Sequence, residues 1–424
     1  MTRALVGVFI AFFAAQLAVE VGLALLSYRH VRLGRGHPAG GASPGDVARS
    51  RDYALAKTRL GILHALWGAA VTLALLFSGF LPALDRALAA AGLRGPHLFV
   101  AYLALLSALV AASSLPFQLY GTFVVEQRFG FNRTTPSLWL KDRLKGLALA
   151  AVLGVPLLYA TYGFMAFTGR AWWLWLFAFF TAFQVVMVWL YPALIAPIFN
   201  RFSPLPEGPL RSRLEALARD AGFRTRGLYV MDASRRSGHS NAYFMGFFRP
   251  RIVLFDTLVD GMAVEEAAAV LAHEIGHFRL RHVHKRLAAG LAGTLVTLWV
   301  VSRLLEWPPL FAAAGFDRPS FHAALALLSL CGGAFTFFLE PISAWLSRRH
   351  EYQADRFAVR LTGGGAALRD SLSRLHGQNL SIPNPHPWNS AWHDSHPPLP
   401  QRAAAIEREA ALVQRGAAAE PVAG

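Results

Sequence analysis

The chain has 424 residues, of which 54% are hydrophobic and only 16% are charged. This little charge cannot cover the surfaces of two or three soluble domains, so the composition predicts an integral membrane protein. The net charge of +16 would suggest nucleic-acid binding in a soluble chain. Here the basic residues cluster between apolar runs, which indicates contact with anionic lipid, and no nucleic-acid partner is expected. The single cysteine, Cys331, excludes an intramolecular disulfide and a Cys-rich zinc site.

Seven stretches are apolar and long enough to cross a bilayer, or nearly so. They lie at about 4–28, 61–81, 97–120, 145–167, 171–199, 287–305 and 320–346. The sixth is the weakest, because Arg303 shortens it. The first lacks a small-residue cleavage site at its end, so it is expected to be a retained anchor rather than a signal peptide. We therefore expect a mainly α-helical polytopic membrane protein, with five spans in 1–199 and two more in 287–346.

The loops between the predicted spans alternate in charge. The loop after the first span and the loop after the third carry most of the Lys and Arg of this region. The loops after the second and fourth spans are short and carry only Arg86, Arg94 and Arg170 as basic residues. By the positive-inside rule the N-terminus lies outside and the two basic loops are cytoplasmic. Seven spans then place segment 200–286 and the region from 347 onward together on the cytoplasmic side.

Segment 200–286 has the pattern of a small cytoplasmic α+β unit. A polar helix at about 207–221 precedes RGLYVMDA, HSNAYFMGFF and RIVLFD. These three stretches are typical of β-strands, and a turn at Arg249-Pro250 is expected to join the last two into a hairpin. A helix then begins near Asp260 or Gly261, and its Ala, Glu and Leu content favours helix through HEIGHFRLRH.

The stretch VLAHEIGHFRLRHVHK at 270–285 contains an H-E-x-x-H motif. His273 and His277 are four residues apart, so on a helix their imidazoles project from one face, one turn apart, as two ligands of a tetrahedral zinc do. Glu274 is rotated by about a hundred degrees, which places it outside easy ligand reach but within reach of a water at the metal. The motif also occurs incidentally in helices, but its small and apolar neighbours argue for zinc.

A zinc site needs a third ligand. The metzincin pattern would place Gly at 280 and His at 283, and Leu280 and Val283 exclude that subclass. His282 lies five residues past His277 and is expected to point away from the ligand face. We therefore assign His282 and His284 to the cytoplasmic edge of the membrane.

A better candidate lies in RRHEYQADRFAVRL at 348–361, directly after the seventh span. Glu351 and Asp355 are four residues apart on the expected helix, so one can bind zinc while the other holds a ligand histidine in place. The alternative is an ordinary pattern of solvated charges at a helix start. The predicted topology argues against that alternative, because it brings this helix to the same membrane face as His273 and His277.

Several separate blocks of the sequence resemble the CAAX prenyl endopeptidase family, which comprises membrane-embedded zinc metallopeptidases with seven spans. The resemblance covers roughly residues 50–405. It rests on EQRFGFNRTT (126–135), GHSNAYFMGFFRPRIVLFDTL (238–258), HEIGH (273–277), EYQADRFA (351–358) and SHPPLPQR (395–402). The Ala and Arg bias indicates a bacterial member with a GC-rich genome. The resemblance implies a gluzincin-like catalytic unit and spans that enclose a large water-filled chamber.

The resemblance also implies roles for individual residues. His273, His277 and Glu351 would bind zinc, one ion per chain. Glu274 would be the general base, and Asp355 would hold a ligand histidine from the second coordination layer.

Three further residues, Asn241, His396 and Arg402, would lie in the active site. His396 is expected to stabilise the developing oxyanion, and Asn241 to help place the substrate. The strand in NAYFMGFF would offer an edge along which an extended peptide can pair through its backbone.

The expected partners are membrane lipids and a peptide or protein substrate, including one with a lipidated C-terminus. One alternative is a housekeeping protease that clears misfolded membrane proteins without a lipid preference. A second alternative is a multispan scaffold or transporter with an incidental motif. Segment 347–414 would complete the catalytic unit, and the low-complexity tail at 415–424 is expected to be disordered.

Overall fold

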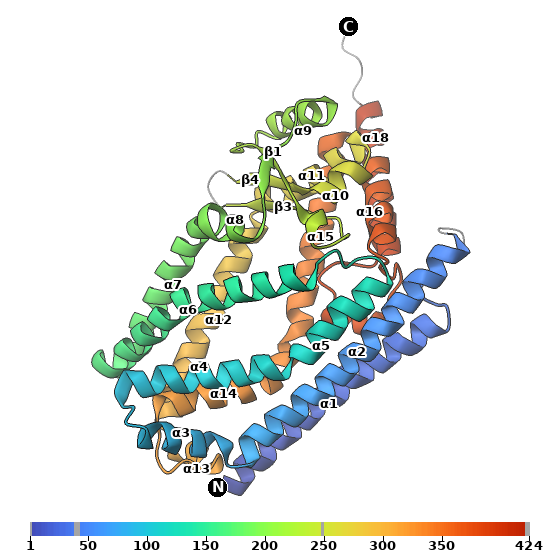
Figure 1. Ribbon diagram of the computed structural model, residues 1–424. Coiled ribbons are helices and arrows are strands. Elements are labelled where there is room, and N and C mark those ends of the chain that lie inside the picture. The colour runs from blue at the N-terminus through green and yellow to red at the C-terminus, as the bar shows by residue number, and fades with distance from the viewer. Residues whose placement is uncertain (1, 38–42, 247–249, 420–424) are drawn as a thin grey trace.

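The computed structural model describes residues 2–37, 43–246 and 250–419. Most of these residues are helical, and the helices form a tall bundle with a small sheet-containing unit at one end (Figure 1). α1 (Thr2–Arg32) begins at the opposite end of the bundle, and α18 (Leu399–Ala419) ends beside the sheet-containing unit. The predicted polytopic α-helical fold is confirmed.

Seven helical runs in the described residues are long and apolar enough to cross a membrane. They are α1 (Thr2–Arg32), α2 (Pro44–Phe77), α4 (Gly95–Ser113), α6 (Pro136–Phe167), the run Gly169–Phe199 with α7 (Trp172–Leu190) and α8 (Ala196–Phe199), α12 (His282–Leu305), and the run Phe321–Thr362 with α14 (Phe321–Thr336) and α15 (Glu340–Thr362). The shorter helices α3 (Phe80–Ala90), α5 (Leu115–Tyr120) and α13 (Pro308–Ala313) connect or extend these runs. All seven predicted spans correspond to one of these runs.

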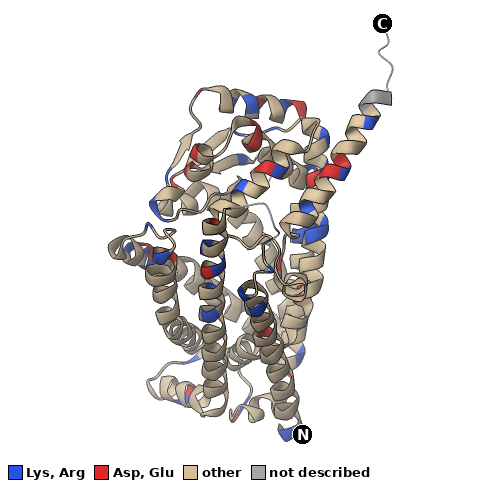
Figure 2. Cartoon of the chain, turned by 90° about the vertical axis from the view of Figure 1, so that its right-hand side faces the viewer, with Lys and Arg blue, Asp and Glu red and all other residues tan. Residues whose placement is uncertain are grey.

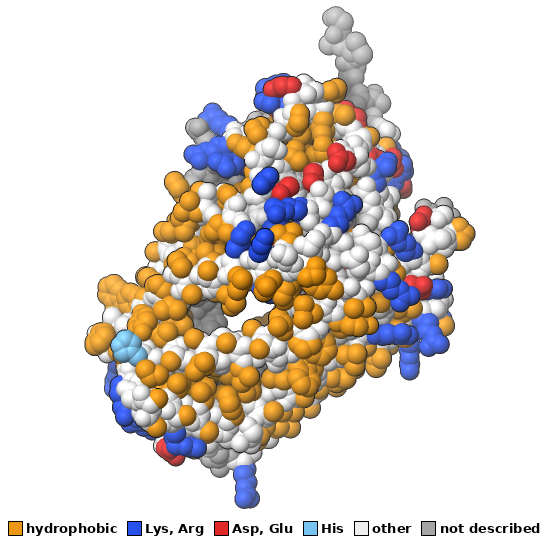
Figure 3. Space-filling model, in the orientation of Figure 1, with side chains coloured by type: hydrophobic (Ala, Val, Ile, Leu, Met, Phe, Trp, Pro, Cys, Tyr) orange, Lys and Arg blue, Asp and Glu red, His pale blue; other side chains and the backbone are white. Residues whose placement is uncertain are grey.

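The surface of the bundle matches a lipid environment. Lys, Arg, Asp and Glu gather on the sheet-containing unit and at the ends of the helices (Figure 2). Apolar side chains cover the lower part of the molecule, where the spanning helices lie (Figure 3). The same view shows an opening through the wall between α4 and α6, so the bundle is hollow rather than filled.

A small four-stranded sheet forms the centre of the sheet-containing unit. Its strands are β1 (Phe202–Pro204), β2 (Leu228–Met231), β3 (Ala242–Met245) and β4 (Arg251–Phe255), in the order β1-β2-β4-β3. β3 and β4 pair antiparallel, with Tyr243 opposite Val253, as the predicted hairpin requires; part of its turn, at 247–249, lies outside the described residues. β2 and β4 are parallel. β3 is an edge strand, so its outer side is open to a further strand.

Helices cover the sheet and bury a common apolar core. They are α9 (Pro209–Asp220), α10 (Asp256–Gly261), α11 (Val264–Arg279), α16 (Ala366–Gln378) and α18 (Leu399–Ala419), with the short α17 (Pro387–His393) beside α15. Leu214, Ile252, Leu271 and Val359 are almost completely buried in this core. The core therefore joins segment 200–286 to the C-terminal region, as a shared catalytic unit requires.

Two expectations need correction. The single helix expected from Asp260 onward is two helices, α10 and α11, because Met262 leaves the helix in an extended conformation. Residues 415–419, expected to belong to a disordered tail, continue α18 to Ala419. Their high alanine content favours helix. Residues 420–424 lie outside the described residues.

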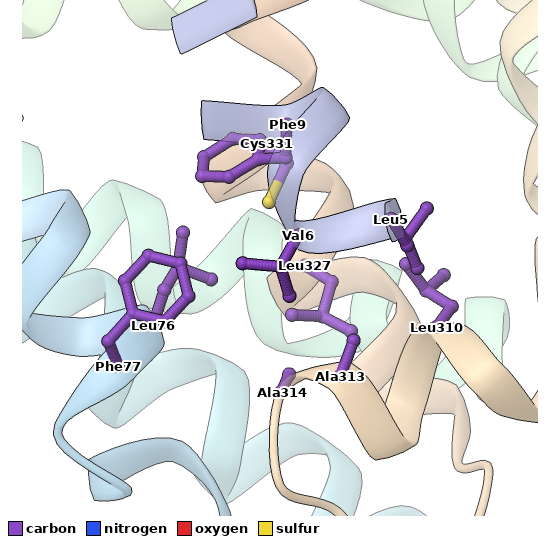
Figure 4. A pocket seen from close by; sticks show the side chains of 10 residues that line it. All are labelled: Leu5, Val6, Phe9, Leu76, Phe77, Leu310, Ala313, Ala314, Leu327 and Cys331. Carbon is purple, nitrogen blue, oxygen red and sulfur yellow. The ribbon is translucent and has the colours of Figure 1, made fainter. Parts of the chain in front are cut away.

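An apolar cavity of about 60 Å³ lies at the N-terminal end of the bundle (Figure 4). Side chains of α1, α2, α13 and α14 line it, among them Phe9, Phe77 and Cys331. It lies at the end opposite the catalytic unit.

Candidate metal centre

Three ligand-type side chains converge between α11 and α15. The Nε2 atoms of His273 and His277 lie 3.1 Å apart. Glu351 Oε2 lies 3.4 Å from His273 Nε2, and Glu351 Oε1 lies 3.2 Å from His277 Nε2. All three residues are buried, and one ligand atom from each fits within 4.8 Å of the others. Three ligand atoms from residues that are far apart in the sequence therefore lie close together.

A close helix crossing makes this convergence possible. Gly276 lies between the two histidines, and a Cβ atom there would lie 3.1 Å from Ala354 Cα and 3.2 Å from Ala354 O. Ala354, which is fully buried, is also small. Small residues on both helices let the backbones approach closely. Because Gly276 has no side chain and Ala354 has only a methyl group, α11 and α15 can cross closely enough to bring Glu351 next to the histidines.

The other ring nitrogen of His273 faces a buried ion pair. Asp355 Oδ1 lies 2.8 Å from His273 Nδ1. Arg402 donates hydrogen bonds of 2.9 and 2.6 Å to the two oxygens of the same carboxylate. Burial acts to lower the pKa of His273, but the Asp355 and Glu351 carboxylates outweigh it and raise this pKa to about 9. The arrangement directs Nδ1–H of His273 to Asp355, so Nε2 is the ring atom that faces His277 and Glu351 and can bind a metal.

The second histidine, His277, has a different partner. Its Nδ1 lies 3.0 Å from Nδ1 of His282, a residue with no exposed surface. His282 is the first residue of the candidate span His282–Leu305, as expected of a membrane-edge residue, but its side chain is buried against His277 instead of pointing away from it. α11 ends at Arg279, and Arg281 adopts a left-handed conformation that turns the chain before α12 begins. His284 is half-buried, with its ring 6.4 Å from that of Phe278.

The remaining predicted site residues lie at different depths. Glu274 is half-buried on α11, and its charge acts on the neighbouring Arg402. The His396 side chain is 63% exposed, and its Nδ1 lies 2.7 Å from Glu351 Oε2. Asn241 is exposed at the start of β3, where its side-chain oxygen accepts a hydrogen bond from Ala242 N. Among the described residues, no hydrogen bond or ion pair joins Asn241 to the cluster.

The donor set fits a zinc ion. Two imidazole Nε2 atoms and one carboxylate are typical ligands of a catalytic zinc, which keeps a further position open. Glu351 Oε2 is buried and makes no hydrogen bond within the described part of the chain, although His396 Nδ1 lies 2.7 Å from it. A buried carboxylate oxygen without a hydrogen bond is costly, and a metal ion would satisfy it.

A large cavity opens beside the cluster. It has a volume of about 800 Å³ and is lined by α12, α15, α17 and the segment that follows α17. His350 and Ser395 line it, and they are the sequence neighbours of Glu351 and His396. Lys285 and Arg286 on α12 make part of its wall basic. The cavity therefore lies near the cluster, although none of His273, His277 and Glu351 is among the residues that line it.

Comparisons with known proteins agree with this architecture. Residues 28–201 match the family described as CAAX prenyl protease N-terminal, five membrane helices, and residues 204–410 match peptidase family M48. The CAAX prenyl protease 1 homolog of Oryza sativa subsp. japonica is 36% identical over 85% of this chain and 86% of its own length. CAAX prenyl protease 1 of Saccharomyces cerevisiae is 36% identical over 72% of this chain and 71% of its own length.

The structural likeness extends over almost the whole chain. The crystal structure of S. mikatae Ste24p superposes with a TM-score of 0.87 at 30% sequence identity, covering 94% of this chain and 98% of that chain. The hollow helical bundle and its buried His-His-Glu group define a membrane-embedded metallopeptidase. The chain belongs to the CAAX prenyl protease family, within peptidase family M48, and is a multi-pass zinc metalloendopeptidase.

Sequence reasoning missed two residues of this centre, His282 and its partner Gln353. Neither belongs to the H-E-x-x-H motif. The helix break that brings His282 back carries no Gly or Pro, so no sequence signal marked it. Gln353 lies between Glu351 and Asp355, and its spacing predicts another helix face.

Proposed function

We propose that the chain binds one zinc ion through His273, His277 and Glu351 and cleaves peptides whose C-terminus carries a lipid, at the cytoplasmic face of the membrane. The observation that carries this proposal is the buried convergence of the three side chains, with distances of 3.1 to 3.4 Å between their donor atoms. The cavity of about 800 Å³ beside them supports an extended substrate.

The chemistry divides among the residues around the metal. Zinc in a site with two histidines and one carboxylate supplies Lewis-acid activation of water and of the scissile carbonyl. Glu274 takes a proton from the attacking water and delivers it to the leaving amine. His396, largely exposed beside Glu351 Oε2, donates a hydrogen bond to the developing oxyanion. Arg402 is buried behind Asp355, so it acts by holding Asp355, which in turn orients His273.

The outer side of β3 provides a place for the substrate backbone. An extended peptide can add to this edge as a further strand, which gives affinity with little demand on sequence. Asn241 lies at the start of this strand and is exposed, so its side chain can contact a substrate there.

The lipid preference separates this proposal from a housekeeping role in clearing misfolded membrane proteins. Its test compares a peptide with a farnesylated cysteine near the C-terminus with the unmodified twin, using purified protein in detergent and mass spectrometry. We expect kcat/KM to be at least tenfold higher for the farnesylated peptide. Equal values for the two peptides would favour the housekeeping role, and no cleavage of either peptide would contradict both.

The orientation of the chain has its own test. The loop charges favour an N-terminus outside and both catalytic segments in the cytoplasm. Reporter enzymes fused after residues 90, 230 and 420 should report outside, inside and inside. An outside signal at residue 230 would move the catalytic unit to the other face of the membrane.

A further inference from the structure

We propose that His282 is a positioning residue for His277: it accepts the Nδ1–H of His277 and thereby fixes that ring with Nε2 toward the metal. Gln353 in turn fixes the proton of His282. This inference rests on the proposed role of His277 as a zinc ligand. It assigns a function to a contact between two buried histidines that the proposed mechanism does not use.

The backbone conformation is the first observation. His282 follows Arg281, whose φ of 57° is in the left-handed region. A non-glycine residue pays about 1–2 kcal/mol for this conformation, and such strain persists where the surroundings impose it. The turn at Arg281 separates α11 from α12 and directs the side chain of His282 back toward α11. As a result, its Nδ1 comes to 3.0 Å from Nδ1 of His277.

The proton positions then follow from the metal-ligand role. A histidine that offers Nε2 to a metal carries its proton on Nδ1. His277 therefore donates from Nδ1, and Nδ1 of His282 must be the acceptor. A neutral His282 then carries its proton on Nε2, which lies 2.9 Å from Oε1 of Gln353. Each ring nitrogen of His277 and His282 therefore has a single role, as metal ligand, hydrogen-bond donor or hydrogen-bond acceptor.

The surroundings hold the His282 ring in place. His282 is completely buried, and its ring stacks on His350 with centroids 4.1 Å apart and planes 13° from parallel. Rotation of the ring would break both hydrogen bonds. His277 thus has a neutral partner, whereas His273 has a carboxylate partner in Asp355. Metal-ligating histidines commonly have such outer partners, and their loss typically costs 10–100-fold in metal affinity or activity.

The test compares two substitutions at His282. In His282→Asn, the amide oxygen takes the place of Nδ1 and still accepts from His277. In His282→Leu, a side chain of similar bulk offers no acceptor. Each purified full-length variant is titrated with Co²⁺, and the visible absorption spectrum and the dissociation constant are measured. We expect His282→Leu to bind Co²⁺ 10–100-fold more weakly with an altered spectrum, and His282→Asn to remain close to wild type.

Gln353 provides a second measurement that does not depend on folding of the Leu variant. Gln353→Leu leaves the tautomer of His282 unfixed, so we expect Co²⁺ affinity to fall about two- to tenfold, the value of one hydrogen bond. In the His282→Asn background the same substitution should have no further effect, because the two residues act as one unit. Unchanged affinity in either Gln353→Leu or His282→Leu would overturn the proposal, as would equal losses in His282→Asn and His282→Leu.

A control separates this effect from general destabilisation. His322 on α14 is also buried, with Nε2 2.9 Å from Asp85 Oδ1 at the opposite end of the bundle. His322→Leu should lower thermal stability and leave Co²⁺ affinity and spectrum unchanged. Failure of the proposed function would look different, since His277→Ala would then keep full Co²⁺ affinity. Weakened Co²⁺ binding in His277→Ala with unaffected binding in His282→Leu would overturn only the present inference.

Discussion

Replacement of Asp355 by Asn tests whether the buried ion pair serves the metal centre or only the fold. Asp355 is 1% exposed, and Arg402 is 5% exposed. Asn keeps the size of the side chain and one acceptor oxygen but removes the charge. Arg402 would then lose its hydrogen-bonded carboxylate and keep Glu351, with Nη1 3.6 Å from Oε2, and the more distant charge of Glu274. Breaking one side of a buried charge pair costs about 3–5 kcal/mol, and the retained acceptor favours the lower value.

The same substitution should weaken zinc binding. Loss of the carboxylate that holds His273 is expected to reduce zinc affinity 10–100-fold. Zinc stabilises the folded protein through its affinity, so each tenfold loss removes about 1.4 kcal/mol of zinc-dependent stabilisation. Thermal unfolding with and without zinc, together with zinc titration against a competing chelator, separates the two losses. The metal-free variant should already unfold at a lower temperature than metal-free wild type. Added zinc should raise the unfolding temperature of the variant by less than that of wild type.

A matched control lies on the same two helices. Arg360 and Glu409 also join α15 to α18, with Nε 2.6 Å from Oε1, but away from the cluster. Because the Arg360 side chain is 68% exposed, Glu409→Gln should cost only about 1 kcal/mol or less and leave zinc affinity unchanged. If Asp355→Asn lowers stability as strongly as expected but binds zinc like wild type, the ion pair is structural and the assigned role of Asp355 is wrong.

Three further substitutions give separate expectations. Glu274→Gln should keep one zinc per chain by elemental analysis while cleavage falls about a hundred- to ten-thousandfold; near-normal cleavage would remove Glu274 from the mechanism. Glu351→Ala should lose both zinc and cleavage, and retention of zinc would exclude it as a ligand. Glu266 accepts hydrogen bonds from Arg374, which hold its pKa below the ordinary 4.5. Glu266→Gln should therefore lower stability by up to about 1 kcal/mol above pH 5. The gap should close as pH falls below 4.5, and chemical unfolding at several pH values will show whether it does.

The sequence predicted the elements whose signal is local. Apolar length marked the spans, short runs rich in β-branched and aromatic residues marked β2, β3 and β4, and four-residue spacing placed His273 and His277 on one helix face. β1 was missed because it has three residues and ends at Pro204, a residue typical of turns and sheet edges. The helix break at Arg281 was missed because the turn uses a non-glycine residue in a glycine-like conformation.

Contacts between distant segments were predictable only in outline. The charge pattern of the loops indicated that segment 200–286 and the region after 347 share a membrane face, but it could not give the distance between Glu351 and the histidines. That distance depends on the crossing of α11 and α15 at Gly276. The pairing of Asp355 with Arg402 likewise depends on how α18 folds back along α15, which a spacing of 47 residues does not specify.

The connections between the catalytic helices and the spans explain why this hydrolytic centre lies at a membrane. Glu351 belongs to α15, which is part of the candidate span Phe321–Thr362. Glu351 lies about 17 Å along α15 from Glu340, at 1.5 Å per residue. On the other side of the centre, α11 reaches the span α12 through a single turn at Arg281. Each half of the donor set is thus continuous with a span, and the cavity lies between those same two spans. A change in the angle between α12 and α15 would therefore alter both the entrance for substrate and the distance from Glu351 to the histidines.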